Sequence, residues 1–363
     1  MKPFFLFALL FCCSHSLLAQ ALISGTVVDA DTRQPLEGAS VIAQNTTRGV
    51  VTNKEGRYQL QLSKGGYELI VSYTGYANKS LNVEAAADQT LDIELKKEEK
   101  NIEEVVIRSS NEVADGWQQY GPAFLKYFIG ATPNADSCTL LNPEALKFLY
   151  FKRNDRVKVL ASEPLQIRNT ALGYNIRYQL DSFVLYNKTQ VNTYRGACLF
   201  QTMEGDTAQQ RQWADARRQA YLGSRLHFMR AYYDSTLKQE GFLVDVLTSG
   251  SRNQFGRLSN PYDTSYYLFD DSTGNAELYF PRKASITYSK SAPSSRFLEQ
   301  YNLPKDVPFQ ISYVDLTDGI LIMPNGYFTD QRHWTNQGYW SWKNLADQLP
   351  YDYEESGKVN GDW

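Results

Sequence analysis

The feature that most constrains the fold is a series of short apolar alternations between residues 22 and 95. In each segment every second residue is apolar, and successive segments are separated by turn-forming residues, which is typical of strands with one face in a core. Several such strands in roughly 75 residues predict a compact antiparallel β-sandwich. The alternating segments are Ile23 to Val27, Val41 to Ala43, Tyr58 to Leu62, Leu69 to Tyr73, Leu81 to Val83 and Leu91 to Leu95.

Turn residues separate these segments for identifiable reasons. Pro35 lacks a backbone donor, and the aspartates that precede it, Asp29 and Asp31, favour turns. Gly56 suits a tight turn with a positive φ. The two aspartates also resemble the start of a calcium-binding loop, but Arg33 stands where such a loop needs an oxygen ligand. We therefore interpret this stretch as a turn.

Four motifs in this region resemble the carboxypeptidase-regulatory-like family. The resemblance covers residues 22–95, about a fifth of the chain, and implies a transthyretin/prealbumin-like sandwich. Such modules occur beside metallocarboxypeptidase domains and before the plug of TonB-dependent outer-membrane transporters, and the module itself carries no catalytic residues. The motifs are Gly25-Thr-Val-Val-Asp29, Pro35-Leu-Glu-Gly38-Ala39-Ser-Val41, Thr52-Asn-Lys-Glu-Gly56-Arg-Tyr58 and Val71-Ser-Tyr-Thr-Gly75-Tyr76.

The first 19 residues have the pattern of a secretory signal. Lys2 supplies the positive charge, Phe4 to Phe11 form the apolar stretch, and Ala19 precedes the cleavage point. The apolar stretch is shorter than the roughly 20 residues of a membrane-spanning helix. Cys12 and Cys13 leave a lipoprotein as an alternative. It is a minor one, because the residue before a lipid-attachment cysteine is normally small, whereas Phe11 precedes Cys12. We expect an exported protein, in the periplasm or associated with the outer membrane, with no transmembrane segment after signal removal.

Charge marks the boundary after the sandwich. Lys96 to Asn101 is charged and has no apolar period. We therefore predict the sandwich at residues 20–95, a linker at 96–112 and a β-rich domain of unknown function at 113–363. Ile102 to Ile107 resembles the segment that follows the sandwich in TonB-dependent receptors. The roughly 250 residues after it cannot supply a plug and a 22-stranded barrel.

The second region is predicted to be a β-rich α+β domain. Helical spacing predicts one helix from Trp117 to Phe128 and one long helix from about Thr207 to Gln239. Asn142-Pro143-Glu144 has the pattern of a helix start. Asp318-Gly319, between 311–316 and 320–322, predicts a hairpin. Further strands are predicted at 157–160, 165–167, 174–180, 183–186 and 242–247. The fold class is mainly β.

Part of the second region also resembles the region that follows the same sandwich in uncharacterised envelope proteins. No activity is attached to that resemblance, which supports architecture and location alone. The segments that carry it are Ala161-Ser-Glu-Pro-Leu165, Leu172-Gly-Tyr174, Tyr221-Leu-Gly-Ser224 and Pro324-Asn-Gly-Tyr327.

Known catalytic signatures are absent from the sequence. The net charge of -3 gives no basic footprint for nucleic acid. Outside the signal only His227 and His333 remain, too few for a zinc site, so we expect no metal. Because there is no P-loop, dinucleotide motif or G-x-S-x-G elbow, we expect no cofactor. Carboxylate pairs have no sequence signature, so a hydrolase acting on glycan or peptide stays as the alternative.

Two groups of residues are candidates for ligand binding. Tyr221, His227 and Arg230 fall on the predicted long helix, where the last two share a face and could hold an anion. Trp334 and Trp340 belong to a C-terminal stretch rich in rings, which could stack on sugars if exposed. A hydrogen-bonded structural histidine and buried rings are the alternatives, and we favour them.

Two cysteines, Cys138 and Cys198, lie outside the signal. In an oxidising periplasm they could pair, whereas the apolar surroundings of Cys198 fit a buried free thiol equally well. Taken together, the patterns predict a non-catalytic envelope protein that binds, scaffolds or assembles. Its partner would be an envelope protein or a glycan, with a link to TonB-dependent uptake.

Overall fold

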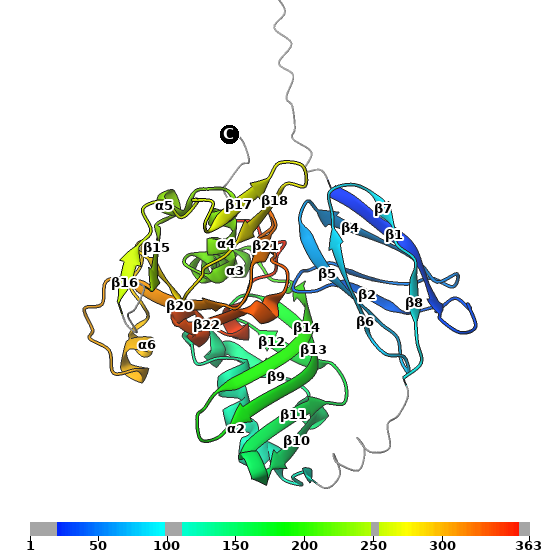
Figure 1. The fold of residues 1–363 in the computed structure, drawn as a ribbon. Coiled ribbons are helices and arrows are strands. Elements are labelled where there is room, and N and C mark those ends of the chain that lie inside the picture. The colour runs from blue at the N-terminus through cyan, green and yellow to red at the C-terminus, as the bar shows by residue number, and fades with distance from the viewer. Residues whose placement is uncertain (1–19, 99–110, 248–253, 356–363) are drawn as a thin grey trace, which may run out of the picture.

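The computed structural model describes residues 20–98, 111–247 and 254–355, and it is β-rich, as predicted (Figure 1). A small sandwich lies beside a larger region of sheets and helices. The predicted signal at residues 1–19 and the segment Ile102 to Ile107 fall outside the described residues.

The sandwich consists of two sheets that enclose one apolar core. Strand alternation produces it directly: in β4 the even-numbered positions from Tyr58 to Leu62 are buried and their neighbours are exposed. The first sheet has the order β4-β1-β7, with β8 also on β1, and the second has the order β3-β2-β5-β6. The strands are β1 (Gln20–Asp29), β2 (Ser40–Ala43), β3 (Gly49–Val51), β4 (Arg57–Ser63), β5 (Gly66–Ser72), β6 (Lys79–Glu84), β7 (Gln89–Thr90) and β8 (Ile93–Leu95).

The pairing within the first sheet differs from the prediction in one respect. Strand β1 pairs with β4 antiparallel, but it pairs with both β7 and β8 in parallel. Alternation alone specifies a buried face and says nothing about the direction of the partner. The purely antiparallel expectation was therefore wrong for this sheet.

Asp29 organises the turn after β1. The buried carboxylate accepts hydrogen bonds from the backbone N–H groups of Asp31 and Thr32 and from the Tyr76 hydroxyl, at 2.9, 2.8 and 2.6 Å. The Tyr76 hydroxyl and these N–H groups lower the pKa of Asp29 below its ordinary value. Its oxygens are thus used within the chain, in agreement with a turn.

The larger region begins with a six-stranded sheet of order β10-β11-β13-β12-β9, with β14 on β13. Helix α2 (Gly116–Phe128) packs on it and lies where it was predicted. Asn142-Pro143-Glu144 starts a helix as predicted, with Asn142 at the N-cap position, but this helix is the single turn η2 (Pro143–Ala145), which leads into a strand. The strands are β9 (Cys138–Leu140), β10 (Leu146–Phe151), β11 (Arg156–Ala161), β12 (Leu165–Asn169), β13 (Tyr174–Tyr186) and β14 (Asn192–Thr202).

Two further sheets complete the larger region. The five-stranded sheet has the order β16-β15-β19-β20-β22, and the three-stranded sheet has the order β17-β18-β21. The predicted hairpin around Asp318-Gly319 was wrong, because β20 pairs with β19 and β22 whereas β21 pairs with β18. The strands are β15 (Phe242–Leu247), β16 (Phe255–Arg257), β17 (Tyr267–Asp270), β18 (Asn275–Leu278), β19 (Ala284–Tyr288), β20 (Gln310–Leu316), β21 (Ile320–Ile322) and β22 (Trp334–Gly338).

The predicted long helix is divided into three. Gly223 has φ 72°, and Ser224 caps the next helix by accepting a hydrogen bond from the His227 N–H. Ser235, with φ 57°, makes the second break. The helices are α3 (Thr207–Tyr221), α4 (Arg225–Tyr233) and α5 (Leu237–Glu240), and the remaining short ones are η1 (Pro133–Ser137), η3 (Lys152–Asn154), α6 (Ser295–Gln300), η4 (Gln331–His333), α7 (Tyr339–Trp342) and η5 (Leu345–Asp347).

The sandwich is joined to the larger region by main-chain hydrogen bonds. The loop between β2 and β3 lies along β14, where the Asn45 N–H donates to the Cys198 carbonyl and the Phe200 N–H donates to the Thr46 carbonyl, at 2.8 and 2.9 Å. On its other side the Tyr351 N–H donates to the Asn45 carbonyl at 2.7 Å. We call this contact of residues 44–48 with β14 and residues 348–352 the junction.

A second contact supports the junction from the start of β5. The Asn325 side chain donates to the Gly66 carbonyl at 2.8 Å and accepts from the Gly66 N–H at 3.3 Å. Gly66 is required there, because a Cβ would lie 2.5 Å from the Met323 side chain and 2.6 Å from the Tyr327 ring.

Candidate binding pocket beside strand β10

His227 is a structural residue of the turn between α3 and α4. It is 2% exposed, and its Nδ1 accepts a hydrogen bond from the Gly223 N–H at 3.1 Å. The ring proton must then be on Nε2, which lies 3.1 Å from Glu240 Oε2. His227 therefore ties the turn to α5.

Arg230 is directed at main-chain carbonyls. Its three guanidinium nitrogens donate to the carbonyls of Asn325, Tyr351 and Tyr353, at 3.1 to 2.9 Å. The guanidinium lies over the Tyr221 ring at 5.6 Å. The structure thus brings Tyr221, His227 and Arg230 together, but these nitrogens anchor the C-terminal segment instead of facing a cavity. This arrangement agrees with the alternative that the three residues support the fold instead of binding a ligand.

The C-terminal tryptophans belong to the core. Trp334 and Trp340 are 7% and 5% exposed, and their rings stack with centroids 6.2 Å apart. Trp340 Nε1 donates to the Gly223 carbonyl at 2.8 Å, and its ring packs against Phe228. Neither ring offers a face to solvent on which a sugar could stack.

The two cysteines are free thiols, so the disulfide does not form. Cys138 lies on β9 and Cys198 on β14, with β12 and β13 between them. Neighbouring strands are about 4.8 Å apart, so three such steps exceed the roughly 7 Å that a disulfide can span. Burial raises the pKa of Cys138 to about 12 and raises that of Cys198 further.

Residues 20–98, 111–247 and 254–355 contain neither a metal-binding cluster nor a membrane-spanning helix. No group of three or more His, Cys, Asp or Glu side chains in these ranges could hold a metal ion. Within the same ranges, no helix combines the length and the apolar character needed to cross a membrane.

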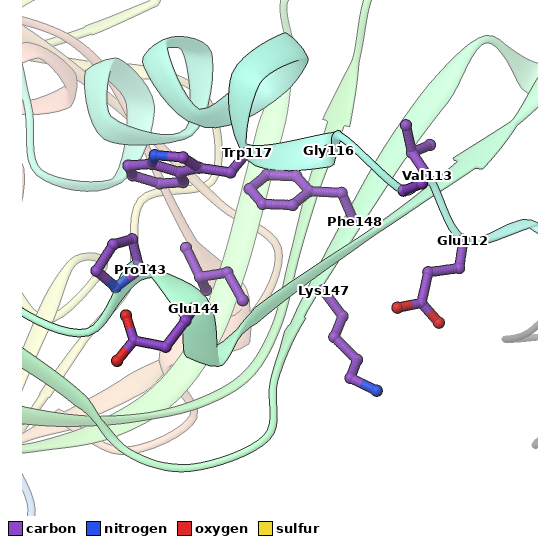
Figure 2. Close-up of a pocket in the computed structure, with 10 residues that line it drawn as sticks. Glu112, Val113, Gly116, Trp117, Pro143, Glu144, Lys147 and Phe148 are labelled. Atoms are coloured by element: carbon purple, nitrogen blue, oxygen red, sulfur yellow. The ribbon is translucent and has the colours of Figure 1, made fainter.

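One pocket of about 310 Å³ lies where α2 begins beside the edge strand β10 (Figure 2). Its apolar wall is formed by Trp117, Pro143 and Phe148. Trp117 is 36% exposed, whereas Phe148 is 2% exposed and packs on the core. The full lining is Glu112, Val113, Ala114, Gly116, Trp117, Pro143, Glu144, Leu146, Lys147 and Phe148.

Two glycines of α2 set the position of the tryptophan. A Cβ on Gly116 would lie 2.5 Å from Phe148 Cβ, so this glycine lets the helix approach β10. A Cβ on Gly121 would lie 2.8 Å from the Trp117 ring, so the ring rests against the next turn of the helix. One side of Trp117 is therefore covered by its own helix, and the ring forms a fixed wall of the pocket.

Strand β10 contributes Leu146, Lys147 and Phe148 to the lining of the pocket. The Ser162 N–H donates to the Ala145 carbonyl. Because every second residue of a strand bonds to its antiparallel neighbour, this bond determines which residues of β10 face β11 with their backbone groups. Leu146 and Phe148 then direct their backbone groups away from β11, toward the open edge. There the Phe148 carbonyl accepts from the Val113 N–H at 2.9 Å. The Phe148 N–H and the Leu146 carbonyl have no partner among the described residues.

Three exposed charged side chains surround the pocket. Figure 2 shows Glu112 and Glu144 at opposite ends, with Lys147 between them. The two carboxylates do not converge on one point, as a pair of catalytic carboxylates must. Sequence reasoning missed this pocket because Trp117 fits the apolar stripe of α2, and only its position at the first turn marks it as different.

Comparison with known proteins supports the resemblance of the sandwich. Residues 23–107 match the family model of the CarboxypepD_reg-like domain. The TonB-dependent receptor P39 of Formosa agariphila is 33% identical over 93 residues, which are 26% of this chain and 9% of that protein. The TonB-dependent receptor SusC of Bacteroides thetaiotaomicron is 33% identical over 88 residues, 24% of this chain and 8% of that protein. This chain thus spans less than a tenth of these relatives.

Among solved structures, a putative membrane-associated protein of unknown function from Bacteroides fragilis is 15% identical. That match covers 44% of this chain and 65% of the other, with a TM-score of 0.18, which is too low to support a shared fold. The comparisons therefore show a CarboxypepD_reg-like domain at residues 23–107 that is similar to a region of TonB-dependent receptors.

Proposed function

We propose that this chain is an exported, non-catalytic envelope protein that binds another envelope component through the pocket beside β10, in association with TonB-dependent uptake. The observation that carries the proposal is the half-exposed Trp117, held by Gly121 at the wall of a preformed pocket. Tryptophan is enriched among protein-binding hot spots, which tend to pair with pockets of the partner protein. The relation of the sandwich to TonB-dependent receptors supports the compartment.

The proposal extends to the organisation of the chain. We assign the signal to residues 1–19, the sandwich to 20–95, the linker to 96–112 and the binding region to 113–363. The junction supports a scaffold role, because it holds the sandwich against β14 by main-chain bonds and so fixes one surface relative to the other. The hydrolase alternative needs two converging carboxylates, and the separation of Glu112 from Glu144 does not favour it.

Site-specific photocrosslinking in the source bacterium tests the function. A photoreactive amino acid replaces Gln118, which lies next to Trp117 on α2, and a control protein carries it at the exposed Leu303, on another part of the larger region. We expect an envelope protein to be crosslinked from position 118 alone, and a TonB-dependent transporter to be among the products. Crosslinks from neither position, or equally from both, would contradict the proposed binding site. A specific partner unrelated to transporters would contradict only the link to uptake.

A further inference from the structure

We propose that the pocket beside β10 binds an extended peptide segment of its partner by strand addition. The inference rests on the proposed binding function and names the chemistry of the partner. Edge strands present unpaired N–H and C=O groups that can pair with another chain, and proteins usually cover or twist such edges. The edge of β10 is covered only along part of its length.

Existing contacts show how a strand would lie along this edge. The chain that enters the larger region already pairs with β10, through the bridge between Glu112 and Leu149 and the bond from Val113 to Phe148. After Val113 the chain turns away, because the Gly116 N–H donates to the Val113 carbonyl as α2 begins. The ladder therefore stops at Phe148, while β10 continues to Leu146.

The unpaired groups point to a peptide. The Phe148 N–H and the Leu146 carbonyl form one donor and one acceptor on the open side of the strand, with no partner among the described residues. A residue of an added strand presents its own carbonyl and N–H toward the neighbouring edge, and so can satisfy both groups. Lone side chains or sugar hydroxyls do not reproduce this spacing along a strand.

The walls of the pocket specify the side chains of the peptide. Trp117 and Pro143 provide an apolar slot, so one residue of the peptide should be aliphatic or aromatic. Glu112 and Glu144 stand at the two ends, so basic residues on either side of it would meet opposite charges (Figure 2). We infer a segment in which an apolar residue lies between two basic residues, in extended conformation.

A labelled pentapeptide, acetyl-Lys-Thr-Leu-Thr-Lys-amide, tests this inference on the full chain. Its affinity is measured by fluorescence anisotropy, together with that of the same peptide N-methylated at the central leucine. Because one backbone hydrogen bond contributes about 0.5–1.5 kcal/mol, we expect N-methylation to weaken binding roughly 2- to 12-fold. Trp117→Ala should weaken binding about tenfold or more, as for other aromatic anchors.

Two variants separate the site from general effects on the fold. Gly121→Ala displaces the Trp117 ring without removing it and should weaken binding, whereas Leu303→Ala, at an exposed position on another part of the larger region, should leave the affinity unchanged. Circular dichroism confirms that each variant is folded.

Several results would overturn strand addition. They are no measurable binding of the pentapeptide, equal affinity for the methylated peptide, or affinity that is unchanged by Trp117→Ala. A neutral hexasaccharide that changes the fluorescence of Trp117, where the peptide does not, would also overturn it. If one of these occurs while crosslinking from position 118 persists, the binding function stands and only the peptide assignment fails. If crosslinking also fails, the proposed function fails with it.

Discussion

The sandwich and the larger region build their cores in different ways. The sandwich core draws all its residues from one continuous stretch between Ala21 and Leu95. The first core of the larger region combines Phe124 of α2 with strand residues and with Tyr353 near the end of the described chain. A core made of consecutive strands can be predicted from local sequence patterns. A core completed by segments distant in sequence depends on contacts that no local pattern reveals. The junction then links the two regions.

Tryptophan fluorescence can report on the larger region alone. The chain has six tryptophans, and none lies between residues 20 and 98. A change made in the sandwich that shifts the fluorescence transition must therefore act through the contacts between the regions. Far-ultraviolet circular dichroism reports on both regions, so the two signals together show whether they unfold as one unit.

The largest expected effect comes from the core of the larger region. Phe228→Ala removes a fully buried ring that packs against Phe242 and Trp340, and should lower the free energy of unfolding by about 3–5 kcal/mol. Phe269→Ala, at a 40% exposed ring, is the matched control with a smaller expected loss. Urea denaturation followed by both signals provides the measurement. Separate transitions, with the sandwich unchanged by Phe228→Ala, would show that the regions unfold independently.

The junction should couple the two regions by a smaller amount. Asn45 has φ 57°, and its Oδ1 accepts from Gln348 Nε2 and from the Cys198 thiol, both at 3.0 Å. Asn45→Ala removes these bonds and disfavours the left-handed backbone, so we expect a loss of about 1–3 kcal/mol in the tryptophan transition.

The matched control for this variant is Asn45→Gly. Glycine keeps the left-handed conformation and loses only the side-chain bonds, so it should be the less destabilised of the two. If neither variant moves the tryptophan transition, the junction does not stabilise the larger region.

Two buried carboxylates should respond to pH in opposite ways. In the sandwich, hydrogen bonds from the Tyr76 hydroxyl, Thr32 and Asp31 lower the pKa of Asp29 below 3.8. Its contribution to stability is therefore present above pH 3.8 and is lost as pH falls through the folded-state pKa. Asp29→Asn should flatten the acid limb of the stability profile. An unchanged acid limb would mean that Asp29 is equally stabilised in the unfolded chain.

In the larger region, burial raises the pKa of Asp347 above 3.8, although Lys343 and the hydrogen bond from Thr132 oppose the shift. The unfolded chain ionises first, so the contribution of Asp347 is most favourable below pH 3.8 and decreases as pH rises through the folded-state pKa. Asp347→Asn should remove this decrease from the tryptophan-detected stability measured at successive pH values. A profile that keeps the same slope would contradict the assignment.

The smallest expected effect is that of a reductant. Because Cys138 and Cys198 are free and separated by two strands, dithiothreitol should leave the unfolding midpoint of both regions unchanged. Thiol titration with Ellman's reagent should be slow for the native protein and rapid in denaturant, since burial raises the pKa of both thiols. A midpoint that falls on reduction would reveal a disulfide and contradict the structure.

The sequence predicts the sandwich well because every strand there shows its buried face. The parallel partners of β1 were missed, since alternation does not encode direction. In the larger region, Gly223 and Ser224 lie within the stripe from which one long helix was predicted, so the break between α3 and α4 was missed. A glycine followed by a capping serine is nevertheless a recognisable signal of such a break. The Asp318-Gly319 turn was identified, but its two strands enter different sheets.

The candidate site was the least predictable part. Residues with suggestive chemistry, such as His227 and Arg230, are used to hold the fold together, and their partners are distant in sequence. The pocket depends on the unpaired edge of β10 and on the space left by Gly116 and Gly121, neither of which has a sequence signature.

The junction also has a consequence for the order of assembly. Thr47 donates to the Asp352 carboxylate from both its N–H and its hydroxyl, although the two residues are 305 positions apart. All strands of the sandwich lie within residues 20–95 and can pair before the C-terminal segment is available, whereas this contact requires Asp352 to be in place. During that interval the exposed loop at residues 44–48 and the edge of β14 are both free to meet other chains. The period between the start and the completion of folding is therefore when this protein is most vulnerable to misassembly.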